Sequence, residues 1–359
     1  MRVWLKTPGS ASFYHETRSA TKVLAVGLGF LGDTVHLIPA LWDLKENYAE
    51  AALHVVSSSI GAAVLAMTPC VERVWTVELD PAKRSLGPQW QVVRALRREG
   101  YGALFEFTGA DRGLILARLT GVPWRVGQLG GRDHFWKRWM IPHWTPPADA
   151  TVPVFEQRRQ MLRGCGLAVS SPRFDVRIPE AARRWAEAAV PGAAVHLSIN
   201  ASTPLKEWPL TNWIELARLL LGQSPGRHLV ATASAREREQ QRLAAFAAAV
   251  NDPRLRVLPA DLTIVQLAAT LGRCAVHVGA DSGVLHLAMA LGIPTVSIFR
   301  DYAGRLAWLP RGPKDRHVHV PCPCVGQADP PCAGRGLARC LGEVAATAIA
   351  ALVRECEAP

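Results

Sequence analysis

Short β-rich runs alternate with helical patterns along this chain of 359 residues, and the alternation starts again near its middle. The first series opens with a strand at 22–29, a helix over 34–48 and a second strand at 53–58. The second series contains strands at 193–199 and 275–280, again with helices between them. Strands that alternate with helices form right-handed crossovers and a parallel sheet. The sequence therefore predicts two consecutive α/β domains.

The expected domains cover residues 1–178 and 179–340, and residues 1–20 are expected to be a loosely ordered extension without the features of a secretory signal. No stretch of eighteen apolar residues lacks a charge, so no membrane span is predicted. Because parallel α/β sheets bind ligands at the carboxyl ends of their strands, we expect the site in a cleft between the domains.

The chain is basic, with 41 Lys and Arg against 30 Asp and Glu and a net charge of +11. This balance favours an acidic partner: nucleic acid, anionic lipid or a phosphorylated substrate. Basic residues and tryptophans are interleaved between residues 112 and 144. The pattern fits nucleic acid or an anionic amphiphile at a membrane surface, and it fits equally a solvated basic face over core tryptophans.

The first segment that could carry chemistry is GFLGDTVHLIPAL, residues 29–41, where a strand runs through a turn into a helix. Gly29 and Gly32 allow close backbone approach or a positive φ. Asp33 would lie at the helix N-terminus, where it can cap backbone amides or serve as a carboxylate base. The spacing is not GxGxxG and no Walker lysine follows, which argues against nucleotide binding at this turn.

A second segment, residues 199–213, is a polar loop that follows the strand at 193–199. Ser202 and Thr203 offer hydroxyls and Lys206 offers a positive charge. This set suits a diphosphate, whose oxygens need donors and charge neutralisation. The alternative is an ordinary strand–helix loop.

A third segment, residues 278–299, places an acidic residue and a Ser-Gly pair between a strand and a helix. The backbone amides of Ser282, Gly283 and Val284 would form an anion site at the helix N-terminus. His286, on the first turn, can donate to the same anion. Asp281 either caps the helix or binds a ribose or sugar hydroxyl.

In this order and at these separations, the three segments resemble the motifs of the bacterial lipopolysaccharide heptosyltransferases, glycosyltransferase family 9. The family pattern LGDVVxxxPAL corresponds to residues 31–41, GASxPxKxWP to the segment that ends at Pro209, and D-[ST]-G-xx-HLAAALG-x-P to residues 281–294. Each motif is weak alone, but the set is specific and spans most of the chain.

The resemblance implies an α/β fold of the GT-B architecture: two Rossmann-like domains whose parallel sheets face each other across a cleft. It also implies that the terminal helix, residues 341–359, packs back on the N-terminal domain. The implied reaction is inverting transfer of heptose from ADP-heptose to a lipopolysaccharide core or related glycan. The ADP-sugar is the donor substrate, and neither a metal nor another cofactor is required.

The resemblance also assigns roles to residues. Asp33 matches the general base, and Lys206 matches a residue that binds the donor diphosphate, where its charge would stabilise the departing phosphate. Glu237, with Glu239 as a rival, matches the nucleoside contact. The acceptor lies on the N-terminal domain, where Arg112, Arg132 and Lys137 are candidate contacts. The full expected set of donor-binding residues is Ser202, Thr203, Lys206, Glu237, Asp281, Ser282, Gly283 and His286.

Two positions depart from the family pattern, because Asn200 stands where glycine is usual and Arg300 follows Phe299 where glycine is usual. They lie near the donor pocket, so the identity of the donor's sugar and of its nucleobase stays open. The alternatives are a GT-B transferase with another nucleotide sugar or another acceptor, and a basic, non-catalytic nucleic-acid-binding protein, for which no recognised fold is found. The expected location is the cytoplasm, at the inner face of the bacterial inner membrane, with peripheral membrane contact and no nucleic acid.

Four cysteines, Cys322, Cys324, Cys332 and Cys340, lie within nineteen residues. The spacing C-x-C…C…C lacks the paired C-x-x-C knuckles of strong zinc motifs, so it favours structural thiols or an occasional disulfide over a metal site. No metal ligand is assigned, and the choice between metal and disulfide stays open.

Overall fold

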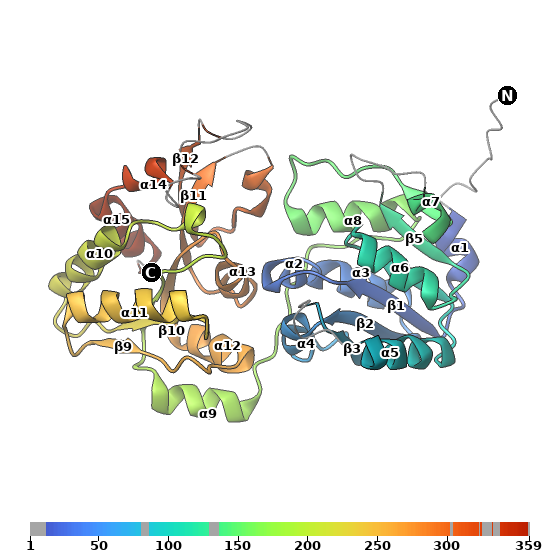
Figure 1. The fold of residues 1–359 in the computed structure, drawn as a ribbon, viewed down its shortest axis with the longest axis horizontal. Helices are drawn as coiled ribbons and strands as arrows, with labels where there is room; N and C mark the ends of the chain where they lie inside the picture. The colour runs from blue at the N-terminus through green and yellow to red at the C-terminus, as the bar shows by residue number, and fades with distance from the viewer. Residues whose placement is uncertain are drawn as a thin grey trace. The chain divides into compact units, whose positions relative to one another are not determined.

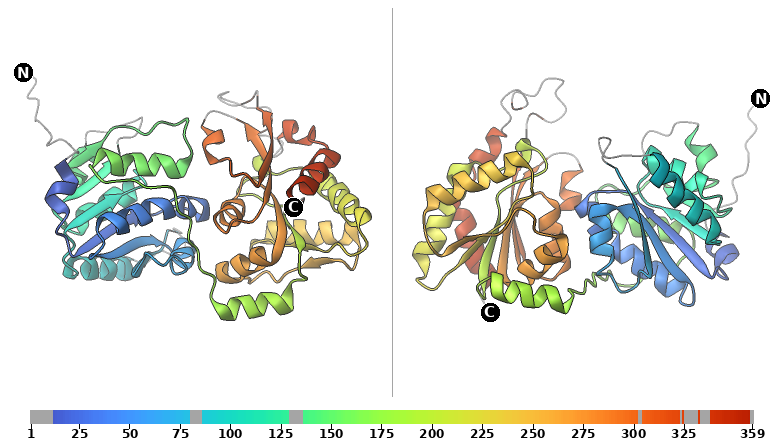
Figure 2. Two further views of the ribbon diagram at one scale, coloured as in Figure 1. Left: turned by 180° about the vertical axis from the view of Figure 1, so that it is seen from behind. Right: turned by 60° about the horizontal axis from the view of Figure 1, so that its bottom comes forward.

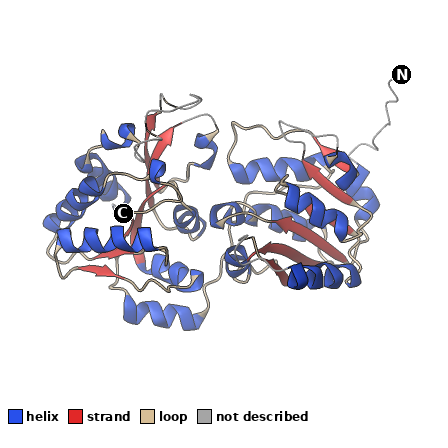
Figure 3. Cartoon of the chain, in the orientation of Figure 1, coloured by secondary structure: helices blue, strands red, loops and turns tan. Residues whose placement is uncertain are grey.

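The computed structural model describes residues 12–79, 86–128, 136–301, 304–322, 324, 332 and 338–357. The chain forms two compact units, Met1–Arg177 and Ile178–Pro359 (Figure 1). In each unit, helices flank a six-stranded parallel sheet (Figures 2 and 3). The predicted fold class, α/β with two Rossmann-like units, is confirmed. Within the described residues, no helix has the length and apolar character that crossing a membrane requires.

The sheet of the first unit has the strand order β3-β2-β1-β4-β5-β6, with every neighbouring pair parallel. Five of the six β1 residues are buried, which is typical of a parallel strand covered on both faces. This order is that of a Rossmann sheet, in which the chain reverses direction of winding between β1 and β4. The strands are β1 (Lys22–Gly27), β2 (Ala52–Ser58), β3 (Arg73–Val77), β4 (Ala103–Glu106), β5 (Arg125–Gln128) and β6 (His143–Thr145).

The helices of the first unit cover both faces of its sheet, with separate apolar clusters on the two sides. They are α1 (Phe13–Thr17), α2 (Leu31–Val35), α3 (Ile38–Asn47), α4 (Ser59–Leu65), α5 (Leu86–Arg98), α6 (Asp111–Leu119), α7 (Lys137–Met140) and α8 (Val154–Gly164). The helix predicted over 34–48 is two helices, α2 and α3. Pro39 lies in the first turn of α3, where its missing N–H costs no helical hydrogen bond, so the chain restarts a helix there.

The prediction that residues 1–20 form a loosely ordered extension is wrong for residues 12–20. Phe13 of α1 is fully buried, and its ring packs edge-on against Phe105 and Trp124 at centroid distances of 5.3 and 5.9 Å. Thr17 hydrogen-bonds the hydroxyl of Tyr48 at 2.6 Å. Burial of this aromatic ring anchors the segment. Residues 1–11 lie outside the described part of the chain.

The sheet of the second unit has the order β12-β11-β10-β7-β8-β9, again parallel throughout. The edge strands β9 and β12 were not predicted, because they are only partly buried and lack a continuous apolar run. The strands are β7 (Ala194–Ser198), β8 (Leu229–Ala231), β9 (Leu255–Val257), β10 (Cys274–Ala280), β11 (Thr295–Asp301) and β12 (Asp315–Pro321).

The terminal helix α15 (Ala346–Glu357) lies on the second unit, so the prediction that it packs back on the N-terminal domain is wrong. Ile349 and Val353 are fully buried in the core that contains Trp208 and Trp213. Trp208 also donates from Nε1 to the carbonyl oxygen of Val344 at 3.1 Å. The apolar face of α15 is therefore buried within its own unit.

The other helices of the second unit surround the same sheet. They are α9 (Glu180–Ala189), α10 (Leu210–Gln223), α11 (Glu237–Val250), α12 (Ile264–Arg273), α13 (Gly283–Ala290) and α14 (Arg339–Gly342), with short 3-10 helices η2 (Pro204–Lys206) and η3 (Arg305–Trp308).

Candidate functional site

Asp33 lies in the first turn of α2, just beyond the carboxyl end of β1. Its Oδ2 accepts a hydrogen bond from the backbone N–H of Phe30 at 3.1 Å, so the side chain does cap the helix. Its Oδ1 lies 3.4 Å from Nη2 of Arg158 in α8, and 30% of the side chain stays exposed. A Cβ on Gly29 would lie 2.3 Å from the Cβ of Asp33, so only glycine lets the turn pass this side chain. Capping thus leaves one carboxylate oxygen for other chemistry.

A buried carboxylate lies at the end of the neighbouring strand β4. Glu106 accepts hydrogen bonds from the backbone N–H groups of Thr108 at 3.0 Å and Gly109 at 2.8 Å. Burial raises the pKa of Glu106, while its hydrogen bonds and the charge of Arg158 act in the opposite direction. Burial also lowers the pKa of the Arg158 guanidinium, opposed by Asp33 and Glu106. Sequence reasoning missed Glu106 and Arg158, although a glutamate inside the apolar run ALFEF was a usable signal.

In the second unit, the loops after β7 and β10 meet, because these strands are neighbours in the sheet. Nζ of Lys206 lies 2.9 Å from Oδ2 of Asp281, and Nη1 of Arg305 lies 2.8 Å from the same oxygen. The structure therefore brings together the second and third sequence segments. It adds Arg305, which no motif indicated.

The N-terminus of α13 adjoins this ion cluster. Ser282 is the N-cap residue and makes no side-chain cap bond, and its buried Oγ has no hydrogen-bond partner among the described residues. Gly283 begins the helix, and Nε2 of His286 lies 4.0 Å from Oδ1 of Asp281. Burial lowers the pKa of His286 to about 4, against the effect of Asp281 and with the help of Lys206 and Arg305. His286 is therefore neutral at neutral pH and adds no charge to this cluster.

The loop that carries Lys206 is held by an ion pair between the buried Glu207 and the partly exposed Arg238. Glu207 accepts hydrogen bonds from Nη1 of Arg238 at 2.8 and 2.9 Å and from the backbone N–H of Ala201 at 3.1 Å. Ser202 and Thr203 are exposed on the same loop. Their hydroxyls are thus accessible, while the ends of the loop are fixed.

The two acidic candidates for the nucleoside contact differ in their surroundings. Glu237 is exposed at the start of α11 and accepts a hydrogen bond from Gln241 at 3.0 Å. Glu239 is buried, and its Oε2 accepts hydrogen bonds from the backbone N–H and the hydroxyl of Ser234 at 3.1 and 2.8 Å. Glu239 therefore fixes the loop after β8, and Glu237 is the more accessible carboxylate.

Of the basic candidates of the first unit, Arg112 lies in the first turn of α6, and the side chain of Lys137 in α7 reaches the N-terminal end of the same helix. Nη1 of Arg112 donates to the carbonyl oxygen of Leu79 at 2.8 Å, and Nζ of Lys137 lies 3.6 Å from Asp111. Arg112 also lines a cavity of about 410 Å³ that contains the exposed side chains of Trp90 and Ile115. Arg132 lies outside the described residues.

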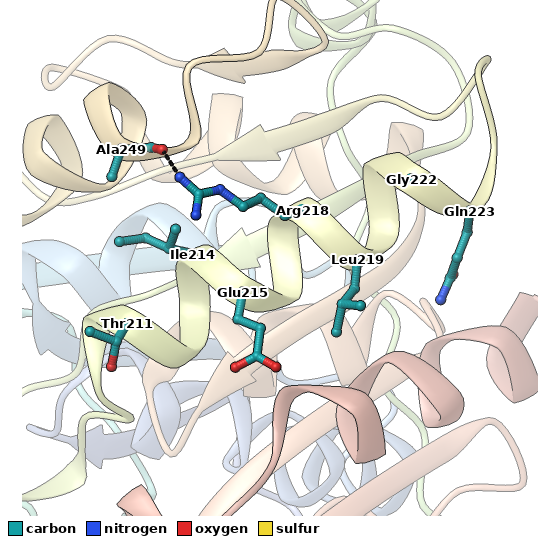
Figure 4. Close-up of a pocket in the computed structure, with 8 residues that line it drawn as sticks. All are labelled: Thr211, Ile214, Glu215, Arg218, Leu219, Gly222, Gln223 and Ala249. Carbon is teal, nitrogen blue, oxygen red and sulfur yellow. Dashed lines mark hydrogen bonds between the residues drawn. The ribbon is translucent and has the colours of Figure 1, made fainter.

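A second hollow of about 780 Å³ runs along α10, as shown in Figure 4. Arg218 lines it and donates to the carbonyl oxygen of Ala249 at 2.6 Å. None of the residues that line this hollow is among the expected donor-binding residues.

All eight cysteines are unbridged thiols. Across the described ranges, no group of three or more His, Cys, Asp or Glu side chains is arranged to hold a metal ion.

Two Rossmann-like units, with cationic side chains and a helix N-terminus gathered beyond the second sheet, define a protein of the GT-B glycosyltransferase class. The sequence profile of glycosyltransferase family 9 (heptosyltransferase) matches residues 89–332, and the chain belongs to this family. The protein is therefore a glycosyltransferase, and the predicted family is confirmed.

Known proteins similar to the chain are consistent with this assignment. It is 27% identical over 300 residues to lipopolysaccharide heptosyltransferase 1 of Pseudomonas aeruginosa, a match that covers 77% of this chain and 78% of that protein. The structure of E. coli ADP-heptose lps heptosyltransferase II matches with a TM-score of 0.74 and 17% identity, over 94% and 98% of the two chains. E. coli heptosyltransferase WaaC with ADP matches with a TM-score of 0.69 and 19% identity, over 93% and 97%.

Proposed function

We propose that this protein is an inverting heptosyltransferase that moves a heptose from ADP-heptose to a lipopolysaccharide core or a related glycan. The observation that carries the proposal is the cluster of Lys206, Asp281 and Arg305 beside the N-terminus of α13. It occurs in a member of the heptosyltransferase family, and similar proteins are named for lipopolysaccharide heptose transfer or were solved with ADP.

On the donor side, departure of ADP leaves negative charge on the β-phosphate. Lys206 and the first backbone amides of α13 stabilise that charge as it develops, which is where preorganised electrostatics contribute most to a rate. Neutral His286 donates a hydrogen bond without adding charge. The hydroxyls of Ser202, Thr203 and Ser282 supply further donors, and Glu237 binds the nucleoside.

On the acceptor side, Asp33 accepts the proton of the attacking hydroxyl through the oxygen that does not cap α2. Arg112, Arg132 and Lys137 contribute positive charge that attracts an anionic glycolipid. In this proposal the enzyme works in the cytoplasm, in peripheral contact with the inner face of the inner membrane, because its acceptor is anchored there.

A thermal-shift panel of ADP-, UDP- and GDP-sugars tests the donor assignment. A ligand that binds only the folded state stabilises it by about 2.7 kcal/mol at one hundred times its Kd. ADP-heptose and ADP should raise the Tm, and the other nucleotides should not. Transfer of heptose to a heptose-free lipopolysaccharide acceptor, followed by mass spectrometry of the product, then tests the reaction.

One specific observation favours a second candidate, transfer of another nucleotide sugar. Asn200 and Arg300 replace glycines of the family pattern beside the donor loops. A Tm increase with a UDP- or GDP-sugar and none with ADP would select this alternative.

A further inference from the structure

Arg305 lies in the donor site although none of the sequence motifs includes it. It opens η3 directly after Gly304, which has a φ of 80° in the left-handed region that favours glycine. Nη1 of Arg305 and Nζ of Lys206 approach the same oxygen, Oδ2 of Asp281, at 2.8 and 2.9 Å. Two cations therefore share one carboxylate oxygen.

Packing fixes Arg305 relative to α13. The ring of Trp308, in the same 3-10 turn, lies 5.5 Å from the ring of His286. Leu309 is buried against Leu285 of α13 and Phe299 of β11. These contacts hold η3, which carries Arg305, against α13, the helix whose N-terminus offers backbone amides to an anion.

The charges of this cluster do not balance. Asp281 needs one cation to compensate its buried charge, and Lys206 supplies it. Arg305 is a second cation, with 16% of its side chain exposed, and burial lowers the pKa of its guanidinium while Asp281 raises it. Because His286 is neutral, the cluster of Lys206, Asp281 and Arg305 carries one net positive charge.

We propose that Arg305 is a donor-binding residue that contacts the β-phosphate of the nucleotide sugar. The inference rests on the proposed function only in that the site takes a nucleoside diphosphate. Either cation can turn from Asp281 to a phosphate without leaving the carboxylate uncompensated, since the other remains. The planar guanidinium matches phosphate geometry with two parallel hydrogen bonds, which an ammonium group cannot do.

The β-phosphate contact makes Arg305 discriminate between ADP and AMP. The experiment measures the Kd of both nucleotides by calorimetry for the wild type and for Arg305→Met, Arg305→Lys and Arg311→Met. Arg311 is the matched control, because it is an exposed arginine close by that contacts the carbonyl oxygen of Leu306 at 3.1 Å. The Tm of each unliganded variant reports on folding.

Arg305→Met should weaken ADP binding about tenfold or more and AMP binding less than about threefold, as expected for loss of one charge-assisted contact. Arg305→Lys should fall between the wild type and Arg305→Met, and Arg311→Met should behave as wild type. Equal loss for ADP and AMP, or unchanged ADP binding in Arg305→Met, overturns the assignment and makes Arg305 a structural partner of Asp281.

The same data separate this inference from the proposed function. If the wild type prefers UDP or GDP to ADP, the donor assignment fails, and the Arg305 contact is judged on that diphosphate against its monophosphate. If the wild type binds no nucleoside diphosphate, both proposals are overturned.

Discussion

Nη2 of Arg158 lies 3.4 Å from Oδ1 of Asp33, and the same guanidinium donates through Nη1 to the carbonyl oxygen of Phe107 at the end of β4. One arginine of α8 thus contacts both the carboxyl end of β4 and the proposed base. Since Oδ2 of Asp33 is engaged by the N–H of Phe30, the carboxylate is held in a single orientation. Its position follows from contacts 125 residues apart in sequence, which a local motif cannot specify.

Asp33→Asn should abolish transfer and leave ADP binding nearly unchanged. Asparagine keeps an oxygen that can accept the hydrogen bond from Phe30, so α2 stays capped, but it cannot accept the acceptor's proton. General-base catalysis contributes roughly 10²–10⁴-fold, so turnover should fall by at least about a hundredfold. Single-turnover kinetics and calorimetry with ADP provide the two measurements. Turnover within a few fold of wild type would return Asp33 to a purely capping role.

Arg158→Met should lower both stability and turnover, because it removes the contact to Oδ1 of Asp33 and a positive charge that acts on the buried Glu106. The double variant Arg158→Met/Glu106→Gln should recover part of the stability but not the turnover, since Asp33 still lacks its positioning contact. Urea unfolding and steady-state kinetics of the wild type, Arg158→Met, Glu106→Gln and the double variant form a double-mutant cycle. Full recovery of turnover in the double variant would show that Arg158 does not position Asp33.

Lys206→Ala should weaken binding of the ADP-sugar and slow the chemical step, because Lys206 provides charge in both the ground state and the transition state. A charge-assisted contact contributes roughly 1.5–3 kcal/mol. Arg305 would still compensate Asp281 in this variant, so the fold should persist. Lys45→Ala is a suitable control, since Lys45 pairs with Glu72 in the other unit. Unchanged affinity and rate would make Lys206 an ordinary surface lysine.

How far the sequence predicted this protein depends on the range of the interactions involved. The parallel sheets follow from buried runs such as that of β1, and the meeting of Lys206 with Asp281 follows from motifs placed after neighbouring strands. Arg158 and Arg305 were missed because nothing local distinguishes them from surface arginines. Their roles depend on packing that brings distant segments together.

The terminal segments show the same limit. Phe13 was assigned to a loose extension because its surroundings are polar, yet it fills a gap beside Phe105. The apolar stripe of α15 indicated that the helix is buried but not against which sheet. Amphipathic patterns predict that a face is covered and do not identify its partner.

Acid should destabilise the second unit through its buried histidines. Nδ1 of His196 lies 2.8 Å from Nδ1 of His277 on the adjacent strand. Burial lowers the pKa of His196 to about 3 and that of His277 well below its usual value, and it lowers the pKa of His286 to about 4. Since an unfolded histidine titrates near 6.5, the stabilisation is complete above about pH 6.5 and is lost as the pH falls toward the folded pKa values.

Urea unfolding between pH 7.5 and pH 5 measures this effect. Each buried histidine contributes a slope of up to about 1.36 kcal/mol per pH unit below 6.5. For the unfolding of the second unit, His286→Asn should reduce the slope of the free energy of unfolding against pH by about the contribution of one buried histidine. His15→Asn should leave it unchanged, because His15 is exposed on α1. A free energy of unfolding that stays constant over this range would contradict the prediction.

Salt should weaken acceptor binding more than it weakens ADP binding. Arg112 and Lys137 place positive charge near the N-terminus of α6, and exposed charges are screened over about 8 Å in physiological salt. The ADP contacts near Asp281 are more enclosed, so screening reaches them less. The measurements are the acceptor KM and the ADP Kd across a salt series. Arg112→Ala/Lys137→Ala should raise the KM at low salt and flatten its salt dependence. The matched control is Arg183→Ala/Arg184→Ala on exposed positions of α9, which removes the same charge from the other unit. If the acceptor KM is flat with salt and the first double variant behaves like the control, these two residues belong to a solvated basic face rather than to the acceptor site.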